Sequence, residues 1–295
     1  MIELDSSFQQ EIEKLEKERK KQNEFAKKVG YFAYPIAGCL GLFMWWKSVG
    51  GFLFVALGAL ISIPTLVKLW SRNHLTHSFK NNLIAPLLNK LRPGVVYLPS
   101  ASIQEQIFNE SNLFSKPDRY KGEDLFQGKH DKTLFSFSEI HAEKEHKSKN
   151  STTYSTIFKG VFMVADFNKH IKNETYVFTS GGKWFSKFKR VKLENPEFED
   201  NFNVYSDNQI EARYILTPSL MEKIIKLEKE FNAQLFMSFI GRNVYIALKN
   251  SENFFEPDFS KEVSSSLVND IVREIDSCIE IIDELDLNTR IWTKD

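Results

Sequence analysis

Two long apolar runs dominate the hydrophobic pattern of the chain. Residues 29–46 and 49–67 hold eighteen and nineteen residues without a charge, and only Lys47 and Ser48 separate them. As a helix, each run would be about 27 Å long, close to the hydrocarbon thickness of a bilayer. The pattern therefore predicts a tight transmembrane helical hairpin over residues 29–70. A buried hairpin in a soluble core is the alternative, and a cleaved signal peptide is disfavoured because a second apolar run follows at once.

Basic residues flank the two runs unevenly. Six lysines and arginines lie between residues 17 and 28, and Lys68, Arg72 and Lys80 follow the second run, whereas the connector carries Lys47 alone. Cytoplasmic flanks of membrane helices carry an excess of Lys and Arg. The distribution predicts a multi-pass anchor with both termini in the cytoplasm.

A charged helical arm, residues 1–28, precedes the first run. Apolar or small residues alternate at spacings of four and three along a seam with two polar positions: Phe8, Ile12, Leu15, Arg19, Gln22, Ala26 and Val29. This spacing is typical of a short coiled coil with another chain or with the helix after the second run. A solvated helix that continues the first run fits the seam equally well.

Residues 71–295 have the pattern of an α+β cytoplasmic domain, an antiparallel sheet covered by helices. Helices are predicted at 74–91, interrupted by Pro86, at 102–114 with Ser102 as cap, at 217–231 and at 261–286. Strands are predicted at 95–98, 133–146, 153–167, 174–179, 189–193, 202–205 and 210–216, with a final hairpin of 234–240 and 244–249 around Gly241-Arg242-Asn243. The last helix places Val263, Leu267, Ile271, Ile275, Cys278, Ile282 and Leu285 on one stripe, which should cover the sheet.

The charge distribution narrows the classes of partner. Residues 1–92 carry thirteen Lys and Arg against seven Asp and Glu, and the remainder carries twenty-six against thirty-two. An acidic domain lacks the basic face that phosphate binding requires, so nucleic acid is not expected as a partner. The basic part brackets the apolar runs, where anionic lipid headgroups of a bilayer would lie. Two cysteines, Cys39 and Cys278, are too few for a disulfide scaffold.

Candidate chemistry is sparse. His74 with His77, and His141 with Glu143 and Glu145, have spacings that a metal could use, but lysines surround the second set and the first lacks further ligands. Asp166 and His170 could form an acid–base pair. The strongest candidate cluster combines four polar residues: Asp166, Asp207, Glu211 and Arg213. An ion pair that fixes a turn is the simpler interpretation of the last three, and no catalytic residue, metal or cofactor is assigned.

A loop rich in glycine, aromatic and basic residues lies at 181–190. Membrane-contact candidates in it are Trp184, Phe185, Phe188, Lys187, Lys189 and Arg190. Exposed aromatic side chains beside cations bind to the interface of an anionic bilayer. The alternative is that these aromatics fill the core under a strand connection.

Four stretches carry a family resemblance: FKGVF with DFNK at 158–169, VKLENPEF at 191–198, VYSDNQIEARY at 204–214 and LNTRIWTK at 287–294. They resemble a bacterial membrane-protein family known as domain of unknown function 3137. Asn195 stands where we expect an aspartate in that family. The resemblance implies association with the bacterial inner membrane and a genomic neighbourhood with LemA-type membrane proteins, which makes such a protein a candidate partner. It implies no activity, cofactor or catalytic residue.

Two functions fit these observations. The favoured one is a non-enzymatic interaction or scaffolding protein on the inner face of the membrane, because the anchored domain shows no catalytic grouping. The other is a membrane-tethered enzyme or small-ligand sensor with a pocket near Asp166, Asp207, Glu211 and Arg213. A deep pocket with convergent polar groups would favour the second function. The sequence leaves open whether the chain forms homo-oligomers.

Overall fold

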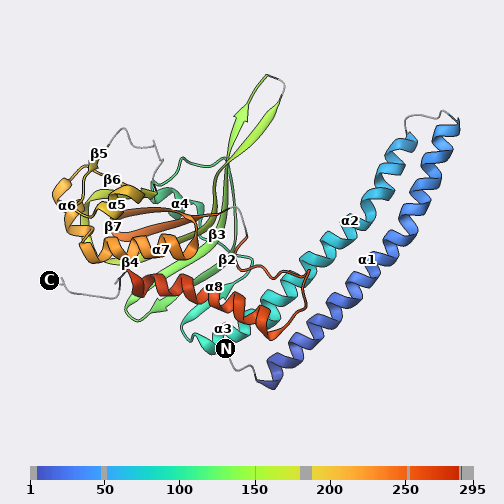
Figure 1. Cartoon of the computed structure of the whole chain (residues 1–295), viewed down its shortest axis with the longest axis horizontal. Helices are drawn as coiled ribbons and strands as arrows, with labels where there is room; N and C mark the ends of the chain where they lie inside the picture. The colour runs from blue at the N-terminus through green and yellow to red at the C-terminus, as the bar shows by residue number, and fades with distance from the viewer. Residues whose placement is uncertain are drawn as a thin grey trace. The chain divides into compact units, whose positions relative to one another are not determined.

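The computed structural model describes residues 5–47, 52–149, 151–179, 188–250, 253–285 and 287, and it leaves out the side chains of residues 40–60 and 168–170. The chain divides into two compact units (Figure 1). The first unit comprises residues 1–87 and 256–272, and the second comprises residues 88–255 and 273–295. The first is built on a long helix pair and the second on an antiparallel sheet.

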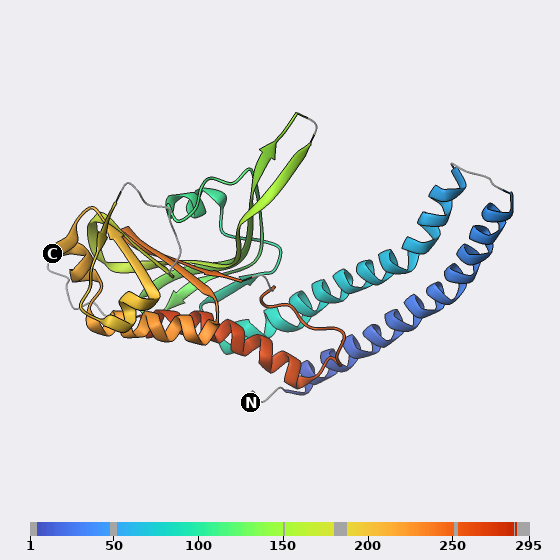
Figure 2. The same cartoon turned by 45° about the horizontal axis from the view of Figure 1, so that its top comes forward.

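The first unit is centred on two long helices, α1 (Ser6–Lys47) and α2 (Phe52–Ser78), which lie side by side in both views (Figures 1 and 2). The carboxylate of Asp5 starts α1, because it accepts hydrogen bonds from the backbone N–H groups of Ser7 and Phe8. The hydroxyl of Ser71 on α2 donates to the side chain of Gln22 on α1 at 2.8 Å. The predicted arm and the first apolar run therefore form one continuous helix.

A narrow stripe of α1 is buried. Ile12, Leu15, Ala33 and Ala37 are all less than one-tenth exposed. The two alanines, with the buried Gly30, allow close approach of the helix backbones. Gln22, one of the two polar positions of the predicted seam, bonds within the chain to α2. A coiled coil as such is not shown, and its pairing with another chain stays a prediction.

The predicted transmembrane hairpin falls largely on residues 40–60, whose side chains lie outside the described part of the chain. Two long helices are present where the hairpin was expected. When only the described residues are searched, no helix combines the length and the apolarity that crossing a membrane requires.

The helix predicted at 74–91 is broken into three pieces. After α2, a π-helical segment, η1 (Phe79–Ile84), leads into α3 (Ala85–Leu91). Pro86 explains the break, because proline has no N–H to donate and its ring clashes with the carbonyl four residues earlier. The wider π turn accommodates this, and the N–H of Ala85 bonds to the carbonyl of Lys80 five residues back.

The second unit is built on a seven-stranded sheet in which all pairings are antiparallel. Its path runs β1-β2-β3-β4-β6-β5, and β7 also pairs with β4. The strands are β1 (Val95–Leu98), β2 (Arg119–His130), β3 (Thr133–Lys147), β4 (Thr152–Thr179), β5 (Lys189–Val191), β6 (Phe202–Ser206) and β7 (Gln234–Lys249). The expected α+β class with an antiparallel sheet is confirmed.

Strand β4 is the common partner in this sheet. Its first half pairs with β3, with Met163 opposite Phe137, and its last residues pair with β6. Strand β7 pairs with β4 over most of its length, with Ile246 opposite Met163. The register shifts around Ile171, which lies opposite Gly241, where the backbone has a φ of +62°. The irregularity bends the two strands together without ending either of them.

Both faces of the sheet are covered. One face holds an aromatic core that includes Phe158, Phe162 and Tyr176 and packs against Phe108 of the short helix α4 (Glu105–Glu110). The opposite face holds the stacked rings of Phe126 and Phe137. Figures 1 and 2 show α7 (Pro218–Phe231) and the last part of α8 (Ser265–Glu284) side by side along one face of the sheet. Lys226 of α7 and Glu284 of α8 form an ion pair at 2.6 Å.

Four sequence predictions for the sheet unit were wrong. The helix expected at 102–114 is confined to α4, and Ser102 does not cap it. Residues around Ile103 stay extended, because its N–H bonds Ser138 Oγ and its carbonyl accepts from Tyr120. The side chain of Ser102 also packs so close to Gly122 that a Cβ added to this glycine would lie 2.6 Å from the Cβ of Ser102. These tertiary contacts override the local helical signal.

The other three wrong predictions are the strand at 210–216, the hairpin around Gly241 and the division of β4 into two strands. Residues predicted as a strand form helix α6 (Gln209–Ile215), because Asn208 caps it by accepting from the N–H groups of Ile210 and Glu211. The hairpin expected around Gly241 is absent from the described residues, where β7 runs straight through as one strand. Likewise the strands predicted at 153–167 and 174–179 are one strand, β4.

Candidate functional site

The outer surface of the helix pair is rich in exposed apolar side chains. Among the described residues, most of the exposed large apolar side chains lie on α1 and α2: Phe25, Tyr31, Phe32, Tyr34, Ile36, Ile61, Ile63, Leu66, Leu69 and Trp70. Trp70 is 68% exposed and Tyr31 is 77% exposed. Isolated exposed apolar residues are ordinary, but a concentration of this kind marks an interaction surface. We call these ten residues the apolar belt.

A charged zone adjoins the apolar belt. Because Gln22 bonds Ser71, the basic residues before the first apolar run and those after the second lie at the same end of the helix pair. Lys27 and Lys28 on α1, and Lys68 and Arg72 on α2, belong to this zone. Beyond Lys28 and before Lys68, the sequence has no charge except Lys47. The aromatic residues Tyr31, Tyr34 and Trp70 lie next to the charged zone, which is where membrane-interface aromatics are found.

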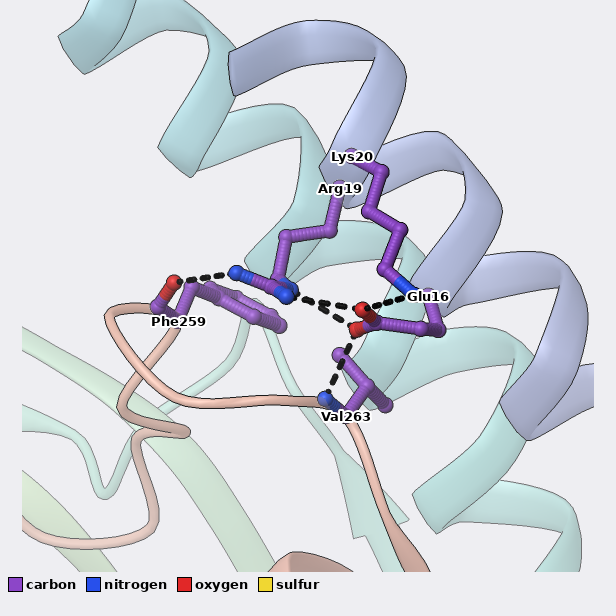
Figure 3. Close-up of polar contacts among 5 residues, drawn as sticks. All are labelled: Glu16, Arg19, Lys20, Phe259 and Val263. Atoms are coloured by element: carbon purple, nitrogen blue, oxygen red, sulfur yellow. Dashed lines mark hydrogen bonds and ion pairs between the residues drawn. The ribbon is translucent and has the colours of Figure 1, made fainter. Parts of the chain in front are cut away.

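A group of polar contacts joins the N-terminal part of α1 to a segment distant in the sequence within the same unit (Figure 3). We call it the ionic clasp; its residues are Glu16, Arg19, Lys20, Phe259 and Val263. Arg19 donates two hydrogen bonds of 2.7 Å to the carboxylate of Glu16, and Lys20 forms an ion pair with the same carboxylate at 3.3 Å. The N–H of Val263 donates to Glu16 Oε2 at 2.9 Å, and Arg19 reaches the carbonyl of Phe259 at 3.5 Å. The ring of Phe259 packs edge-on against Phe79. The clasp therefore joins α1 to the connector before α8.

The electrostatics of this clasp favour the charged form of the glutamate. The Arg19 guanidinium, followed by the Val263 N–H and Lys20, lowers the pKa of Glu16 from 4.5 to about 2, against the opposing effect of burial. The same contact raises the pKa of Arg19. Bidentate pairs of this type are directional, so the clasp fixes the position of the connector along α1.

The sheet unit contains a second buried acidic group, which the sequence analysis missed. Asp124 is fully buried at the irregularity of β2 and accepts a 2.6 Å hydrogen bond from the Tyr97 hydroxyl. Glu139 on β3 is 6% exposed and accepts from the N–H of Phe254 at 3.0 Å. Burial raises the pKa of Glu139 to about 8, and the nearby carboxylates of Asp124 and Glu123 add to that increase. A signal was available: Glu139 continues the two-residue alternation of Phe135 and Phe137, so it must point inward.

The predicted polar cluster does not assemble into one site. Glu211 accepts from the backbone N–H groups of Lys172 and Asn173, and these bonds lower its pKa although burial opposes them. Arg213 donates to the carbonyls of Gln209 and Lys192. Asp207 is exposed on the bend after β6. These three described side chains form no ion pair with one another, and Glu211 by itself binds the backbone of β4 at its irregularity after Ile171.

Asp166 lies apart from the other three, on β4 opposite Asn243. It lines a shallow groove of about 580 Å³ together with Val96, Leu134 and Gly128. The side chain of His170, its predicted acid–base partner, is outside the described residues. The groove gives Asp166 no described catalytic partner.

The predicted membrane-contact loop is described only at its end. Trp184, Phe185 and Lys187 lie outside the described residues. Phe188 is half-buried and its ring lies 5.3 Å from that of Tyr176, so this aromatic belongs to the core. Arg190 pairs with Glu199 at 3.3 Å, and Lys189 is exposed. A membrane contact by this loop stays a prediction that would rest on its other residues.

Metal ligands do not converge in the described part of the chain, where no group of three or more His, Cys, Asp or Glu could hold an ion. His141 lies 3.3 Å from Thr156 Oγ1 and 3.9 Å from Glu143, and Glu145 pairs with Lys147. These contacts are those of an exposed, charged strand pair.

The fold and these surfaces define an α+β protein with an antiparallel sheet unit and a helix-pair unit. Residues 156–287 match the family described as "Protein of unknown function (DUF3137)". The resemblance is thereby confirmed over these residues. The match includes Asn195, which caps helix α5 (Pro196–Asn201) by accepting from the N–H of Phe198. Aspartate caps helices equally well, so the Asn195 position needs no acid.

Two further comparisons give little more. No curated protein matches the chain. A solved structure, the mycobacterial trehalose monomycolate transport factor A, TtfA, is similar with a TM-score of 0.37 and 10% identity, covering 65% of this chain and 88% of that chain. A likeness of this size carries no argument about function.

Proposed function

We propose that the chain is a membrane-anchored interaction protein, in which the helix pair inserts into the bilayer and the sheet unit binds partners on the cytoplasmic side. The apolar belt is the observation that carries this proposal. Its side chains point away from the helix–helix contact, and their transfer from water into hydrocarbon would release about 25 cal/mol for each Å² buried. The uncharged runs 29–46 and 49–67 extend the belt along the sequence.

The charged zone supports a defined depth and orientation. Lys27, Lys28, Lys68 and Arg72 would lie among the headgroups of the cytoplasmic leaflet, where anionic lipids attract cations at about 1 kcal/mol each. Tyr31, Tyr34 and Trp70 would lie at the interface. Both termini would then be cytoplasmic, as would the sheet unit.

The sheet unit supports interaction rather than catalysis as its main role. Its polar candidates are engaged in structural bonds, as Glu211 and Arg213 illustrate. The membrane-tethered enzyme with a pocket near Asp166, Asp207, Glu211 and Arg213 loses its geometric basis, because these four do not converge. A ligand-sensing role depends on a different cavity, which is lined by Phe114, Phe236 and Lys249 among others.

The anchor can be tested by matched substitutions at exposed apolar positions. Replacement of Ile36 and Ile61, which are 51% and 50% exposed, by Glu should move the chain from the carbonate-resistant membrane fraction into the soluble one. The control replaces Val96 and Leu134 of the sheet unit, 47% and 61% exposed, by Glu and should leave the membrane fraction unchanged. Equal behaviour of the two variants, or extraction of the unmodified chain by carbonate, would contradict the anchor.

The orientation has its own test. In a background with Cys39 and Cys278 replaced by Ala, a cysteine at position 48 should react with an impermeant maleimide from outside intact cells. Cysteines at positions 10 and 290 should react only after permeabilisation. External labelling of position 290 would overturn the cytoplasmic placement of the sheet unit.

A further inference from the structure

A cavity of about 510 Å³ opens on the sheet unit at the base of the β3–β4 hairpin. Its walls come from the segment after α4, from β3, from both ends of β4 and from both ends of β7. The lining residues are Leu113, Phe114, Ser115, Lys144, His146, Ser155, Thr156, Ile157, Phe178, Thr179, Gln234, Phe236 and Lys249. The volume is within the range of small-molecule sites.

The charge of this lining is opposite to the net charge of residues 93–295. The described lining has two lysines and a histidine and no carboxylate, although residues 93–295 carry an excess of acidic side chains. Lys144 is engaged, because it pairs with Asp118 at 3.1 Å and donates to the carbonyl of Lys116. The backbone of Lys249 pairs with β4 opposite Gly160, but its half-buried side chain forms no ion pair or hydrogen bond with any described residue. Among the described lining residues, Lys249 is thus a cation that remains available.

Polar groups of the cavity lining are oriented by their own partners. His146 Nε2 lies 2.7 Å from Ser155 Oγ, and Thr156 Oγ1 lies 3.3 Å from His141 Nε2. Thr179 is bonded to the backbone N–H and carbonyl of Leu235. One of Ser155 and His146, depending on the tautomer of the imidazole, can therefore donate a further hydrogen bond to a ligand in the cavity.

The other side of the cavity is an aromatic wall. The ring of Phe114 lies 5.3 Å from that of Phe236, which lies 5.8 Å from Phe178. Phe114 is also 5.0 Å from the buried ring of Phe158. Contacts among rings at these distances hold the wall in one arrangement, so the apolar side of the site is preformed.

We propose that this cavity binds a small anionic amphiphile, a molecule with one carboxylate or phosphate group and an acyl or aromatic body. The anionic group pairs with Lys249, and the apolar body lies against Phe114, Phe178 and Phe236. A half-buried ammonium with no counter-ion among the described residues gains most from a ligand that brings one. The site does not depend on the membrane anchor for its existence, although a bilayer is one source of such ligands.

The test uses the full chain in zwitterionic nanodiscs and a dodecanoate probe with a photoreactive diazirine near the end of its acyl chain. Irradiation should label peptides that contain Phe114, Phe178 or Phe236, as located by mass spectrometry. Excess dodecanoate should compete, whereas dodecanol, which has the same chain without the charge, should not. Labelling confined to α1 and α2, or equal competition by dodecanol, would overturn the proposal.

Variants separate the pocket from general partitioning into lipid. Lys249→Gln should reduce labelling at the aromatic wall about tenfold, because it removes the charge that pairs with the anionic group; tenfold corresponds to about 1.4 kcal/mol. Lys249→Arg should keep it, and Lys192→Gln, which removes an exposed lysine outside the cavity, should have no effect. Unchanged labelling of Lys249→Gln with unchanged melting temperature would refute the role of Lys249.

Inorganic phosphate distinguishes an amphiphile from a free anion. At millimolar concentration it should compete far less than dodecanoate, because it cannot use the aromatic wall. Equal competition at equal concentration would show that the cavity selects the anionic group alone, which contradicts the amphiphile. If the anchor tests fail, the same labelling is carried out with the full chain in buffer without nanodiscs. Because every readout is labelling inside the sheet unit, failure of the anchor would then leave this result standing, and the reverse also holds.

Discussion

Glu16 in the helix-pair unit and Glu139 in the sheet unit are nearly equally buried, at 7% and 6% exposure, yet their pKa values move in opposite directions. Each accepts one backbone N–H, from Val263 and from Phe254 respectively. The difference lies in the depth of the carboxyl group and in its charged neighbours. The hydrogen-bonded Arg19, with Lys20, outweighs burial and holds the pKa of Glu16 at about 2. Burial is the main cause that raises the pKa of Glu139 to about 8, and Asp124 and Glu123 add to it. A cation beside a buried glutamate therefore decides whether burial removes its charge.

The difference has a structural consequence for the connector between β7 and α8. Both donors, Phe254 and Val263, belong to this connector. At its beginning, Phe254 donates to the carboxyl group of Glu139, which gains a proton near neutral pH. Further along, Val263 donates to the carboxylate of Glu16, which stays ionised in all but strong acid. One end of the connector is therefore sensitive to pH in the physiological range, and the other is not.

The largest effect should follow removal of Arg19. Arg19→Met keeps much of the side-chain volume but leaves the buried carboxylate of Glu16 without its main partner, which should destabilise the clasp by about 3–5 kcal/mol. Hydrogen exchange of the Val263 amide should accelerate accordingly in the full chain. The double variant Glu16→Gln with Arg19→Met removes both charges and should recover part of the loss. Unaltered exchange in Arg19→Met would show that the ion pair does not hold the connector.

The pH dependence of Glu139 should be the next largest effect. Because its pKa rises from 4.5 unfolded to about 8 folded, the folded state holds the extra proton between these values. Stability should therefore be highest near pH 5 and fall as pH rises through about 8. Glu139→Gln, which still accepts from the N–H of Phe254, should remove this slope. At pH 9 its free energy of unfolding should exceed that of the unmodified chain by on the order of 3 kcal/mol.

Glu16 provides the matched control for that experiment. Its folded pKa lies below the unfolded value, so its contribution is present above pH 4.5 and is lost as pH falls toward about 2. Glu16→Gln should leave the slope between pH 5 and 9 unchanged. If the slope persists in Glu139→Gln, another group titrates and the comparison of the two glutamates fails at this point.

The smallest effect should come from Lys20, although it also contacts Glu16. Its side chain is 64% exposed and its ammonium lies 3.3 Å from the carboxylate, so solvent screens most of the attraction. Lys20→Ala should change stability by about 0.3 kcal/mol, and added salt should hide the difference. A loss as large as that of Arg19→Met would mean that charge, rather than the bidentate geometry of arginine, stabilises the clasp.

Local signals predicted the elements that depend on local chemistry. Helix α7 begins where Thr217 and Pro218 predict it, with Thr217 accepting from the N–H of Leu220. Helix α8 buries the predicted positions Ile275, Cys278 and Ile282. Strand β3 follows the alternation of Phe135 and Phe137. In each case the sequence period and the packing agree.

The errors occur where distant residues decide the structure. Ile103 stays extended because Ser138 and Tyr120 bind its backbone. Gly241 reads as a turn, but its opposite partner Ile171 on β4 lies in a matching irregularity that keeps β7 continuous. The polar strand β2 has little apolar alternation to reveal it. The clasp was equally hidden, because Glu16 and Val263 are far apart in sequence and only the fold brings them together.

The central position of β4 in the sheet determines the order in which its strand pairs can form while the chain is being synthesised. Its pairing with β3 needs only a neighbouring segment, so that hairpin can form early. Its other long edge waits for β7, whose last residue is Lys249. While the ribosome is still making residues 180–249, this 28-residue strand presents an open row of backbone donors and acceptors. The nascent chain is therefore exposed to wrong strand pairing and to chaperone capture during that interval, until β7 emerges and closes the edge.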